Sequence, residues 1–122
     1  MNRALFLDRD GVVNADRGYV YLKEHFEFTE GIFDLCREYA DGGYILIIIT
    51  NQAGIAKGLY TEADFNRLTK WMTEEFSKEG ITITKAFCIL ISVAMKMMIS
   101  LIHFSFQMIH ITQWSPTYDW HD

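Results

Sequence analysis

Apolar residues in the first part of the chain are spaced in a way that predicts strands alternating with helices. Residues 3–7 form a short apolar run, and Tyr44–Ile49 is a continuous apolar run rich in β-branched side chains. Such a continuous run is typical of a parallel strand that is covered on both faces. Ile81–Phe87 alternates between apolar and polar positions and is also rich in β-branched residues, so it predicts a third strand.

The first predicted helix lies between the first two strands. Thr29 can cap a helix that runs to about Asp41, and Gly42-Gly43 would end it. Residues 12–28, before this helix, show no clean period and predict a loop. The helix has one apolar face at the i, i+3, i+4, i+7 spacing, made of Ile32, Leu35, Cys36 and Tyr39. Cys36 is therefore predicted to be a packed core residue and not a reactive thiol.

A second helix is predicted over about Glu62–Lys78. Thr61 and Asp64 offer a variant of the capping box at its start. Before it, Gly54 and Gly58 bracket a stretch that predicts a flexible loop. The helix carries an apolar stripe that predicts core packing and not a cofactor site, made of Phe65, Leu68, Met72 and Phe76.

The end of the first strand carries the candidate chemistry, Asp8-Arg9-Asp10-Gly11. Two carboxylates one residue apart repel each other, and a divalent cation would relieve this repulsion. Asp8 and Asp10 would point the same way, so one could attack a substrate while the other moves a proton. An ordinary turn, in which an Asp bonds its own backbone and Gly11 supplies a positive φ, stays open as the alternative.

The end of the second strand should lie at the same edge of the sheet. A strand, a helix and a strand form a right-handed βαβ unit, so Thr50 is expected to emerge beside Asp8. The Thr50 hydroxyl and the backbone N–H groups that follow it could bind phosphate oxygens. A Thr-Asn pair is also an ordinary exit from a strand, and the residues alone do not separate these two interpretations.

Three segments together resemble the haloacid dehalogenase superfamily of phosphatases: Leu5–Asn14, Asp16–Val20 and Ile49–Gly58. Within it, the heptose bisphosphate phosphatase branch is the most similar, and the histidinol-phosphatase branch is the alternative. The resemblance extends to about Phe87. It implies an α/β fold, namely a partial Rossmann-like, three-layer domain with a parallel sheet that is truncated here.

The resemblance also implies the roles of individual residues. Asp8 would be the nucleophile that takes the phosphoryl group as an aspartyl-phosphate, and Asp10 the general acid and base. Mg²⁺ would be held by a carboxylate oxygen of Asp8 and the backbone carbonyl of Asp10, and Thr50 would bond a phosphoryl oxygen. The implied substrate is a small sugar phosphate, the 7-phosphate of a heptose 1,7-bisphosphate used for lipopolysaccharide or surface glycans. Substrate contacts carried over by position are Arg9, Asp16, Arg17, Gly18, Tyr19, Asn51, Gln52 and Ala53.

Parts of the superfamily pattern are missing from this chain. No Lys stands in an Arg-Lys-Pro context to stabilise the phosphoryl charge, and no later acidic pair follows an apolar strand. The heptose bisphosphate phosphatase branch also carries a Cys-x-His … Cys-x-Cys zinc loop, and the resemblance places Cys88 at its first position. Leu90 stands at the His position and no Cys follows, so zinc is not expected to bind in that way. We therefore expect an impaired Mg²⁺-dependent phosphatase, with an inactive remnant as a further alternative.

Composition changes where the resemblance ends. All 8 glycines and all but two of the acidic residues lie in residues 1–87, whereas Lys96 is the only Lys or Arg in residues 88–122. Such a break is what a frameshift or a premature end of the reading frame would produce. We therefore divide the chain into residues 1–87, the N-terminal part of a phosphatase domain, and residues 88–122, a foreign apolar tail.

The apolar residues of the tail are expected to be buried, against the sheet edge, a partner chain or a bilayer. Ile89–Ile102 is almost wholly apolar, but the central Lys96 disfavours a membrane span. Residues 102–112 alternate and favour a strand, which could cover the edge of the first strand, although nothing in the sequence requires it. That edge would otherwise be bare, and the chain is expected to self-associate. His103 and His110 are too isolated for a metal site and are expected to be ordinary exposed or core residues.

Charge and cysteine content limit the partners and the compartment. The net charge of −5 argues against a nucleic-acid partner held by phosphate contacts. Two cysteines make no disulfide framework, and no basic-then-apolar leader precedes Leu5, so a reducing cytoplasm is expected.

Overall fold

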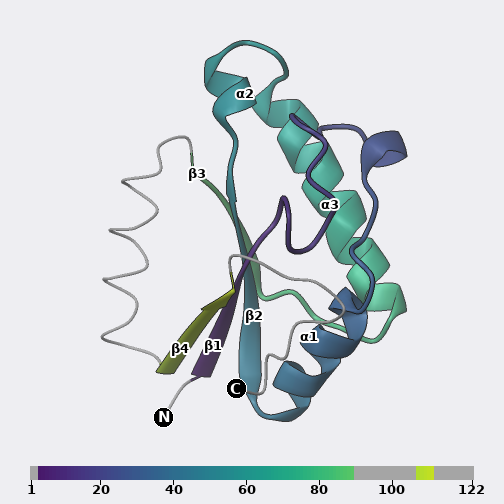
Figure 1. Ribbon diagram of the computed structural model, residues 1–122, viewed down its shortest axis with the longest axis vertical. Helices are drawn as coiled ribbons and strands as arrows, with labels where there is room; N and C mark the ends of the chain where they lie inside the picture. Colours follow the sequence, from purple (N-terminus) through teal and green to yellow (C-terminus); the bar gives the residue numbers. More distant parts are fainter. Residues whose placement is uncertain (1–2, 90–106, 112–122) are drawn as a thin grey trace.

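The computed structural model describes residues 3–89 and 107–111, and their strands form one parallel sheet (Figure 1). The strand order is β3-β2-β1-β4. All three neighbouring pairs are parallel. The predicted α/β fold with a parallel sheet is confirmed. The strands are β1 (Arg3–Asp8), β2 (Tyr44–Asn51), β3 (Lys85–Ile89) and β4 (Gln107–Ile111).

The two long helices, α1 and α3, lie on the same face of the sheet (Figure 1). The connections from β1 to β2 and from β2 to β3 move in the same direction across the sheet, so right-handed crossovers place both helices on one side. A further layer, as in a three-layer domain, would have to come from residues outside the described ranges. The helical segments are η1 (Lys23–His25), α1 (Ile32–Asp41), α2 (Ala53–Ala56) and α3 (Glu62–Lys78).

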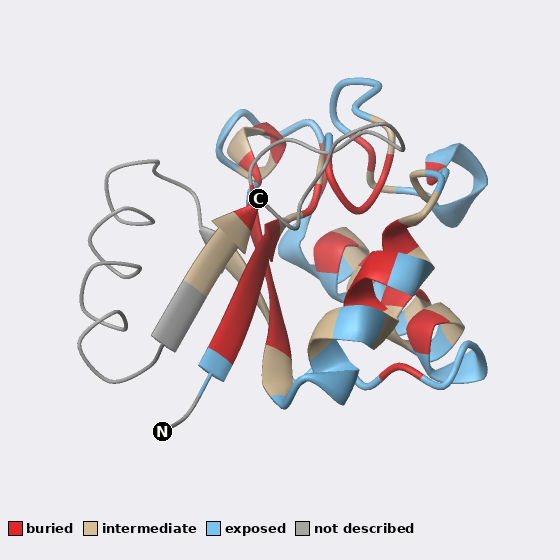
Figure 2. Ribbon diagram, turned by 60° about the horizontal axis from the view of Figure 1, so that its bottom comes forward, coloured by how far each residue is buried: buried red, intermediate tan, exposed pale blue. Residues whose placement is uncertain are grey.

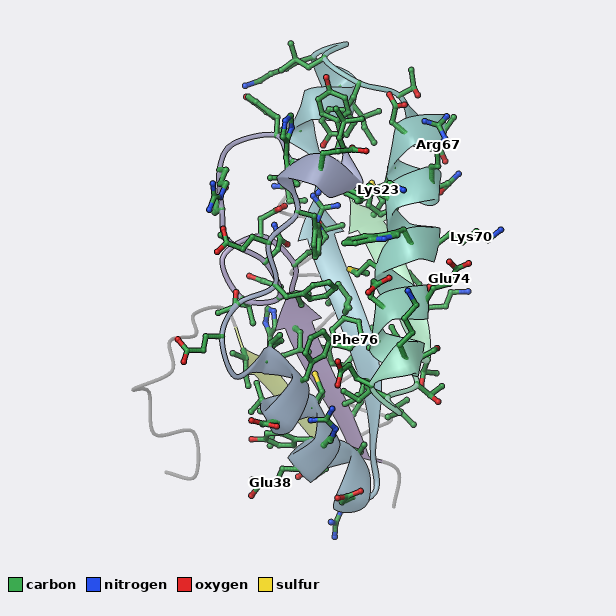
Figure 3. All side chains as sticks on the ribbon, turned by 90° about the vertical axis from the view of Figure 1, so that its right-hand side faces the viewer. Lys23, Glu38, Arg67, Lys70, Glu74 and Phe76 are labelled. Carbon is green, nitrogen blue, oxygen red and sulfur yellow. The ribbon has the colours of Figure 1, made fainter. Side chains whose placement is uncertain are left out.

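The main core lies between these helices and the sheet, where buried residues line the facing surfaces (Figure 2). Both predicted apolar stripes are confirmed, since only Tyr39 among their members is not fully buried. In Figure 3, Lys70 and Glu74 of α3 point away from the sheet while Phe76 points inward. Cys36 is buried as predicted, and this burial raises the pKa of its thiol to about 12. Its thiol therefore stays protonated and unreactive.

The start of α1 differs from the prediction. The helix begins at Ile32 with Gly31 as its N-cap residue, and Gly31 has a φ of +84°. Thr29 does not cap it. Instead, the Thr29 N–H donates to the Val13 carbonyl and the Thr29 carbonyl accepts from the Ile32 N–H, so Thr29 belongs to the turn that precedes the helix.

Two further boundaries were also wrong. The stretch expected to be a flexible loop contains the short helix α2, in which Gly54 is buried. β3 begins at Lys85 and not at Ile81, because Ile81 is buried in the core directly after α3. The chain crosses from the helix layer to the sheet over the next residues, and the Thr84 N–H then donates to the Leu46 carbonyl at 2.8 Å.

The capping box of α3 is confirmed. The Thr61 hydroxyl accepts from the Asp64 N–H at 3.1 Å, and the Asp64 carboxylate accepts from the Thr61 N–H at 2.9 Å. The bond from the Thr61 N–H holds the pKa of Asp64 below its usual value of 3.8, and Arg67 contributes to this lowering. α3 therefore begins at the residue that the local sequence predicts.

A truncated sheet was expected to leave the edge of β1 bare, but another strand covers this edge. β4 pairs with β1 in parallel, from Arg3 opposite Gln107 to Leu7 opposite Ile111. Ile111 is buried in the main core. β1 is therefore an interior strand, although residues 102–106 and 112 of the predicted alternating segment lie outside the described residues.

Among residues 3–89 and 107–111, no helix is long and apolar enough to cross a membrane. The apolar run that continues after Ile89 lies outside the described residues, as do Lys96 and His103.

Candidate active site

The candidate active site lies at the carboxyl end of β1, where the order of the strands reverses. The chain goes from β1 to β2 on one side, and β4 lies on the other. Ligands of open α/β sheets bind at such a switch point. A pocket of about 130 Å³ is located here, and it is lined by Asp8, Arg9, Asp10, Ile49, Thr50 and Asn51. The structure thus brings together predicted site residues from two separate strands.

The Asp10 carboxylate is held by four side chains. Its Oδ1 accepts from Asn14 Nδ2 at 3.0 Å and from Arg9 Nη2 at 3.1 Å. Its Oδ2 accepts from Gln52 Nε2 at 3.2 Å and from Thr50 Oγ1 at 3.4 Å. Bonds to a charged acceptor are stronger than neutral ones. Asp10 is therefore fixed in one orientation, as a group that transfers protons in a defined direction must be.

Asp8 has a different partner. His110 Nε2 lies 2.8 Å from Asp8 Oδ1, and both side chains are about one quarter exposed or less. His110 is opposite Phe6 in the register of β1 and β4, and side chains two apart on a strand share a face, so the imidazole reaches Asp8. The prediction that His110 is an ordinary histidine missed this contact. Pairing the alternating segment with β1 in parallel would have been the signal that revealed it.

Arg9 is buried beneath the site, with 2% of its surface exposed. Besides Asp10, its Nη2 donates to the Val20 carbonyl at 2.8 Å, and its guanidinium lies over the Phe26 ring at 5.9 Å. The Nε of Arg9 is buried without a hydrogen-bond partner among the described residues. Arg9 thus joins the Asp10 loop to the segment around Val20, and its contact with substrate stays a prediction.

The predicted contacts Asp16, Arg17, Gly18 and Tyr19 form an exposed loop. The Asp16 carboxylate accepts from the Gly18 N–H at 3.2 Å, and Arg17 pairs with Glu27. Tyr19 has a φ of +48°, and its hydroxyl accepts from Lys57 Nζ at 2.8 Å. Lys57, the C-cap residue of α2, connects this loop to the segment after β2 and was not identified from the sequence.

The segment after Thr50 divides into inward-facing and outward-facing residues. Gln52 is buried, and its amide Nε2 also donates to Thr50 Oγ1. The hydroxyl of Tyr60 donates to Gln52 Oε1. Asn51 is exposed and lines the pocket, whereas Ala53 is half-buried at the start of α2. Gln52 therefore contacts Asp10 in this structure, and its contact with substrate also stays a prediction.

The donor set at this edge fits Mg²⁺ better than zinc. Asp8 and Asp10 offer hard oxygen donors, and Mg²⁺ is commonly held by one or two carboxylates together with substrate phosphates. Cys88 lies opposite Thr50 in the register of β2 and β3, and burial raises the pKa of its thiol. Within residues 3–89 and 107–111, no three His, Cys, Asp or Glu side chains gather as a metal cluster.

Sequence comparison identifies close relatives for part of this chain. No protein-family model matches it. It is 54% identical over 85 residues to D-glycero-alpha-D-manno-heptose-1,7-bisphosphate 7-phosphatase of Campylobacter jejuni, a match that covers 70% of this chain and 49% of the relative. It is 55% identical over 78 residues to D-glycero-beta-D-manno-heptose-1,7-bisphosphate 7-phosphatase of Helicobacter pylori, covering 64% and 45%. The chain spans about half the length of the curated relatives it matches.

Solved structures agree with the sequence relatives. The structure of D,D-heptose 1,7-bisphosphate phosphatase from B. bronchiseptica, complexed with magnesium and phosphate, superposes with a TM-score of 0.67 at 26% identity. It covers 72% of this chain and 50% of that one. The enzyme from Burkholderia thailandensis has a TM-score of 0.64 at 24% identity, covers 89% and 64%, and supports the fold alone. The matched segment of this chain is therefore homologous to the heptose-1,7-bisphosphate phosphatases, with their haloacid dehalogenase-like fold, as the sequence resemblance predicted.

Proposed function

We propose that this chain is a phosphatase that removes the 7-phosphate of a D-glycero-D-manno-heptose 1,7-bisphosphate. The observation that carries this proposal is the pair Asp8 and Asp10 at the carboxyl end of β1, in one pocket with Thr50. This pair lies in a chain that is 54% identical over 85 residues to a named 7-phosphatase. Relatives are named for both the alpha and the beta anomer, so the proposal covers both.

The proposed reaction has two steps, which use the two carboxylates differently. In the first, a carboxylate oxygen of Asp8 attacks phosphorus, the bond from phosphorus to the sugar oxygen breaks, and Asp10 gives its proton to that oxygen. In the second, Asp10 takes a proton from water, and the hydroxide releases inorganic phosphate from Asp8. The donors around Asp10 support this role because they fix its direction.

Asp8 and the backbone carbonyl of Asp10 would hold Mg²⁺. Bound there, the ion would neutralise charge on the phosphoryl group. The B. bronchiseptica enzyme, complexed with magnesium and phosphate, supports this assignment. Thr50 lines the pocket, so its hydroxyl could bond a phosphoryl oxygen after releasing Asp10.

The setting of the reaction is also part of the proposal. We place the enzyme in the cytoplasm, where it would supply heptose precursors for lipopolysaccharide or surface glycans. Histidinol phosphate is not favoured as the substrate, because the relatives described above are named for heptose bisphosphate. The division at residue 87 and the foreign origin of residues 88–122 remain proposals.

Phosphate release tests this function. The purified chain is given heptose 1,7-bisphosphate or histidinol phosphate with Mg²⁺, and each rate is compared with that of Asp8→Asn. The amide keeps the shape of Asp8 but loses the attacking oxygen, so activity should be abolished. The control is Asp34→Asn, whose carboxylate on α1 is 85% exposed and far from the site. Turnover by Asp8→Asn equal to that of the parent, or a preference for histidinol phosphate, would contradict the proposal.

A further inference from the structure

We infer that Tyr60 is a positioning residue for Asp10 and that it acts through the side-chain amide of Gln52. This inference rests on the proposed function, because it concerns the group assigned as the general acid. The Tyr60 hydroxyl donates to Gln52 Oε1, and Gln52 Nε2 donates to Asp10 Oδ2 at 3.2 Å. Tyr60 lies eight residues after Gln52, in the segment that leads into α3. It does not line the pocket around Asp8 and Asp10.

The direction of each bond in this chain follows from the chemistry of its members. Burial raises the pKa of Tyr60 to about 12, so the hydroxyl keeps its proton and can donate. An amide has one accepting and one donating end, so a donor at Oε1 leaves Nε2 facing Asp10. The reverse orientation would place Oε1 against the carboxylate, oxygen against oxygen. The Asp10 carboxylate therefore sets the orientation of the amide, and the Tyr60 hydroxyl holds the amide in that orientation by donating to Oε1.

The Tyr60 ring is itself held in place by two neighbours. It stacks on Tyr21 with a centroid distance of 5.0 Å and an angle of 7° between the rings. It also lies against Gly54, where an added Cβ would come within 2.2 Å of Tyr60 Cε1. Only glycine permits this approach. Tyr60 and Gln52 are 5% and 2% exposed, so water does not compete freely for their hydrogen bonds.

The expected effect depends on the leaving group of the substrate. A sugar alkoxide is a poor leaving group and needs the proton of Asp10, whereas p-nitrophenolate leaves without one. The second step needs Asp10 for either substrate, so the comparison uses kcat/KM, which reports the first step. A disordered Asp10 should therefore lower kcat/KM for heptose 1,7-bisphosphate more than kcat/KM for p-nitrophenyl phosphate. A general loss of structure would slow the hydrolysis of both substrates equally. The comparison therefore distinguishes a positioning role of Tyr60 from a role in folding.

The test compares Tyr60→Phe with Tyr44→Phe on both substrates. Each variant loses one hydroxyl, and Tyr44 begins β2 at the end remote from Thr50. For Tyr60→Phe we expect kcat/KM on heptose 1,7-bisphosphate to fall about threefold to tenfold, the effect of one hydrogen bond. The value of kcat/KM on p-nitrophenyl phosphate should change by less than about twofold. Equal losses of kcat/KM on the two substrates would overturn the inference.

A measurement without turnover keeps the inference separate from the proposed function. The side-chain amide of Gln52 gives its own pair of signals in a ¹H–¹⁵N NMR spectrum. These signals should shift and exchange faster with water in Tyr60→Phe and in Gly54→Ala, but not in Tyr44→Phe. Unchanged Gln52 signals in Tyr60→Phe would overturn the inference in any case. A parent chain that hydrolyses neither phosphate would count against the proposed function alone.

Discussion

At the scale of single residues, two identical side chains have different neighbours, which suit the different roles proposed for them. Asp10 accepts hydrogen bonds from four side chains, whereas Asp8 faces His110 and the pocket. A nucleophile must stay accessible to its substrate, and a group that transfers protons must keep a fixed orientation. The spacing of the two carboxylates predicts that they lie together, but Thr50, Gln52 and His110 come from sequence positions that only the fold brings close.

Arg9 gives a stability prediction at this scale. Replacing it by methionine keeps much of its volume but leaves Asp10 without its cation and the Val20 carbonyl without a donor. Breaking a largely buried pair in this way should lower the free energy of unfolding by about 3 kcal/mol, as measured by urea denaturation. The control is Arg17→Met, which breaks an exposed ion pair and should change stability by less than about 1 kcal/mol. Equal losses would show that burial of Arg9 contributes nothing.

At the scale of elements, local signals predicted the helices better than long-range ones. α3 begins where predicted because its capping box lies within four consecutive residues. The start of α1 was misplaced because it depends on Gly31 and on a bond between Thr29 and Val13, which no local pattern reveals. His110 was missed for the same reason, since it meets Asp8 across 102 residues. The sequence pattern predicted the strands, but it did not predict the pairing of β4 with β1 that completes the site.

The capping box gives the prediction for α3. Thr61→Ala removes the hydroxyl that accepts from the Asp64 N–H, so it should lower the free energy of unfolding by about 1 kcal/mol. Urea denaturation followed by circular dichroism measures this. Thr82→Ala, at an exposed position outside the helices, is the control and should change little. A loss as large in the control would contradict a capping effect.

The stability that the capping box contributes should depend on pH. The pKa of Asp64 is lowered in the folded chain, so its ionised form contributes stability above its usual value of 3.8, and this contribution is lost as the pH falls through the lowered value. Asp64→Asn should therefore be less stable than the parent at pH 6, and the difference should shrink towards pH 2. A difference that is constant with pH would rule out this linkage.

At the scale of the whole molecule, β4 decides whether the sheet is complete. Ile111 is 8% exposed, lies opposite Leu7 and packs in the main core. Ile111→Asp would place a charge there and detach β4, so we expect a loss of about 3 kcal/mol in unfolding free energy. Because the edge of β1 would then be open, light scattering should also show aggregation. Leu59→Asp, at a side chain that is 52% exposed, is the control.

Catalytic rate is the second prediction for the whole molecule. This chain lacks the Lys in an Arg-Lys-Pro context and the later acidic pair, and one lost electrostatic donor alone costs roughly 10²–10³ in rate. Its kcat on heptose 1,7-bisphosphate should be less than about one per cent of that of the Campylobacter jejuni relative in the same assay. A near-normal rate that disappears in His110→Ala would show instead that β4 supplies a substitute.

Adjacent residues of β4 do two different things: some pack in the core, and one contacts Asp8. Ile109 and Ile111 face the helix-covered core, whereas His110 between them faces Asp8. The hydrogen bonds of a parallel ladder join backbone to backbone. The edge of β1 can therefore pair with any extended segment that has apolar residues at every second position. The residue at position 110 is more restricted, because its side chain contacts Asp8. Selection for a closed sheet and selection for chemistry would therefore act on different residues of one short strand, and either could be satisfied without the other.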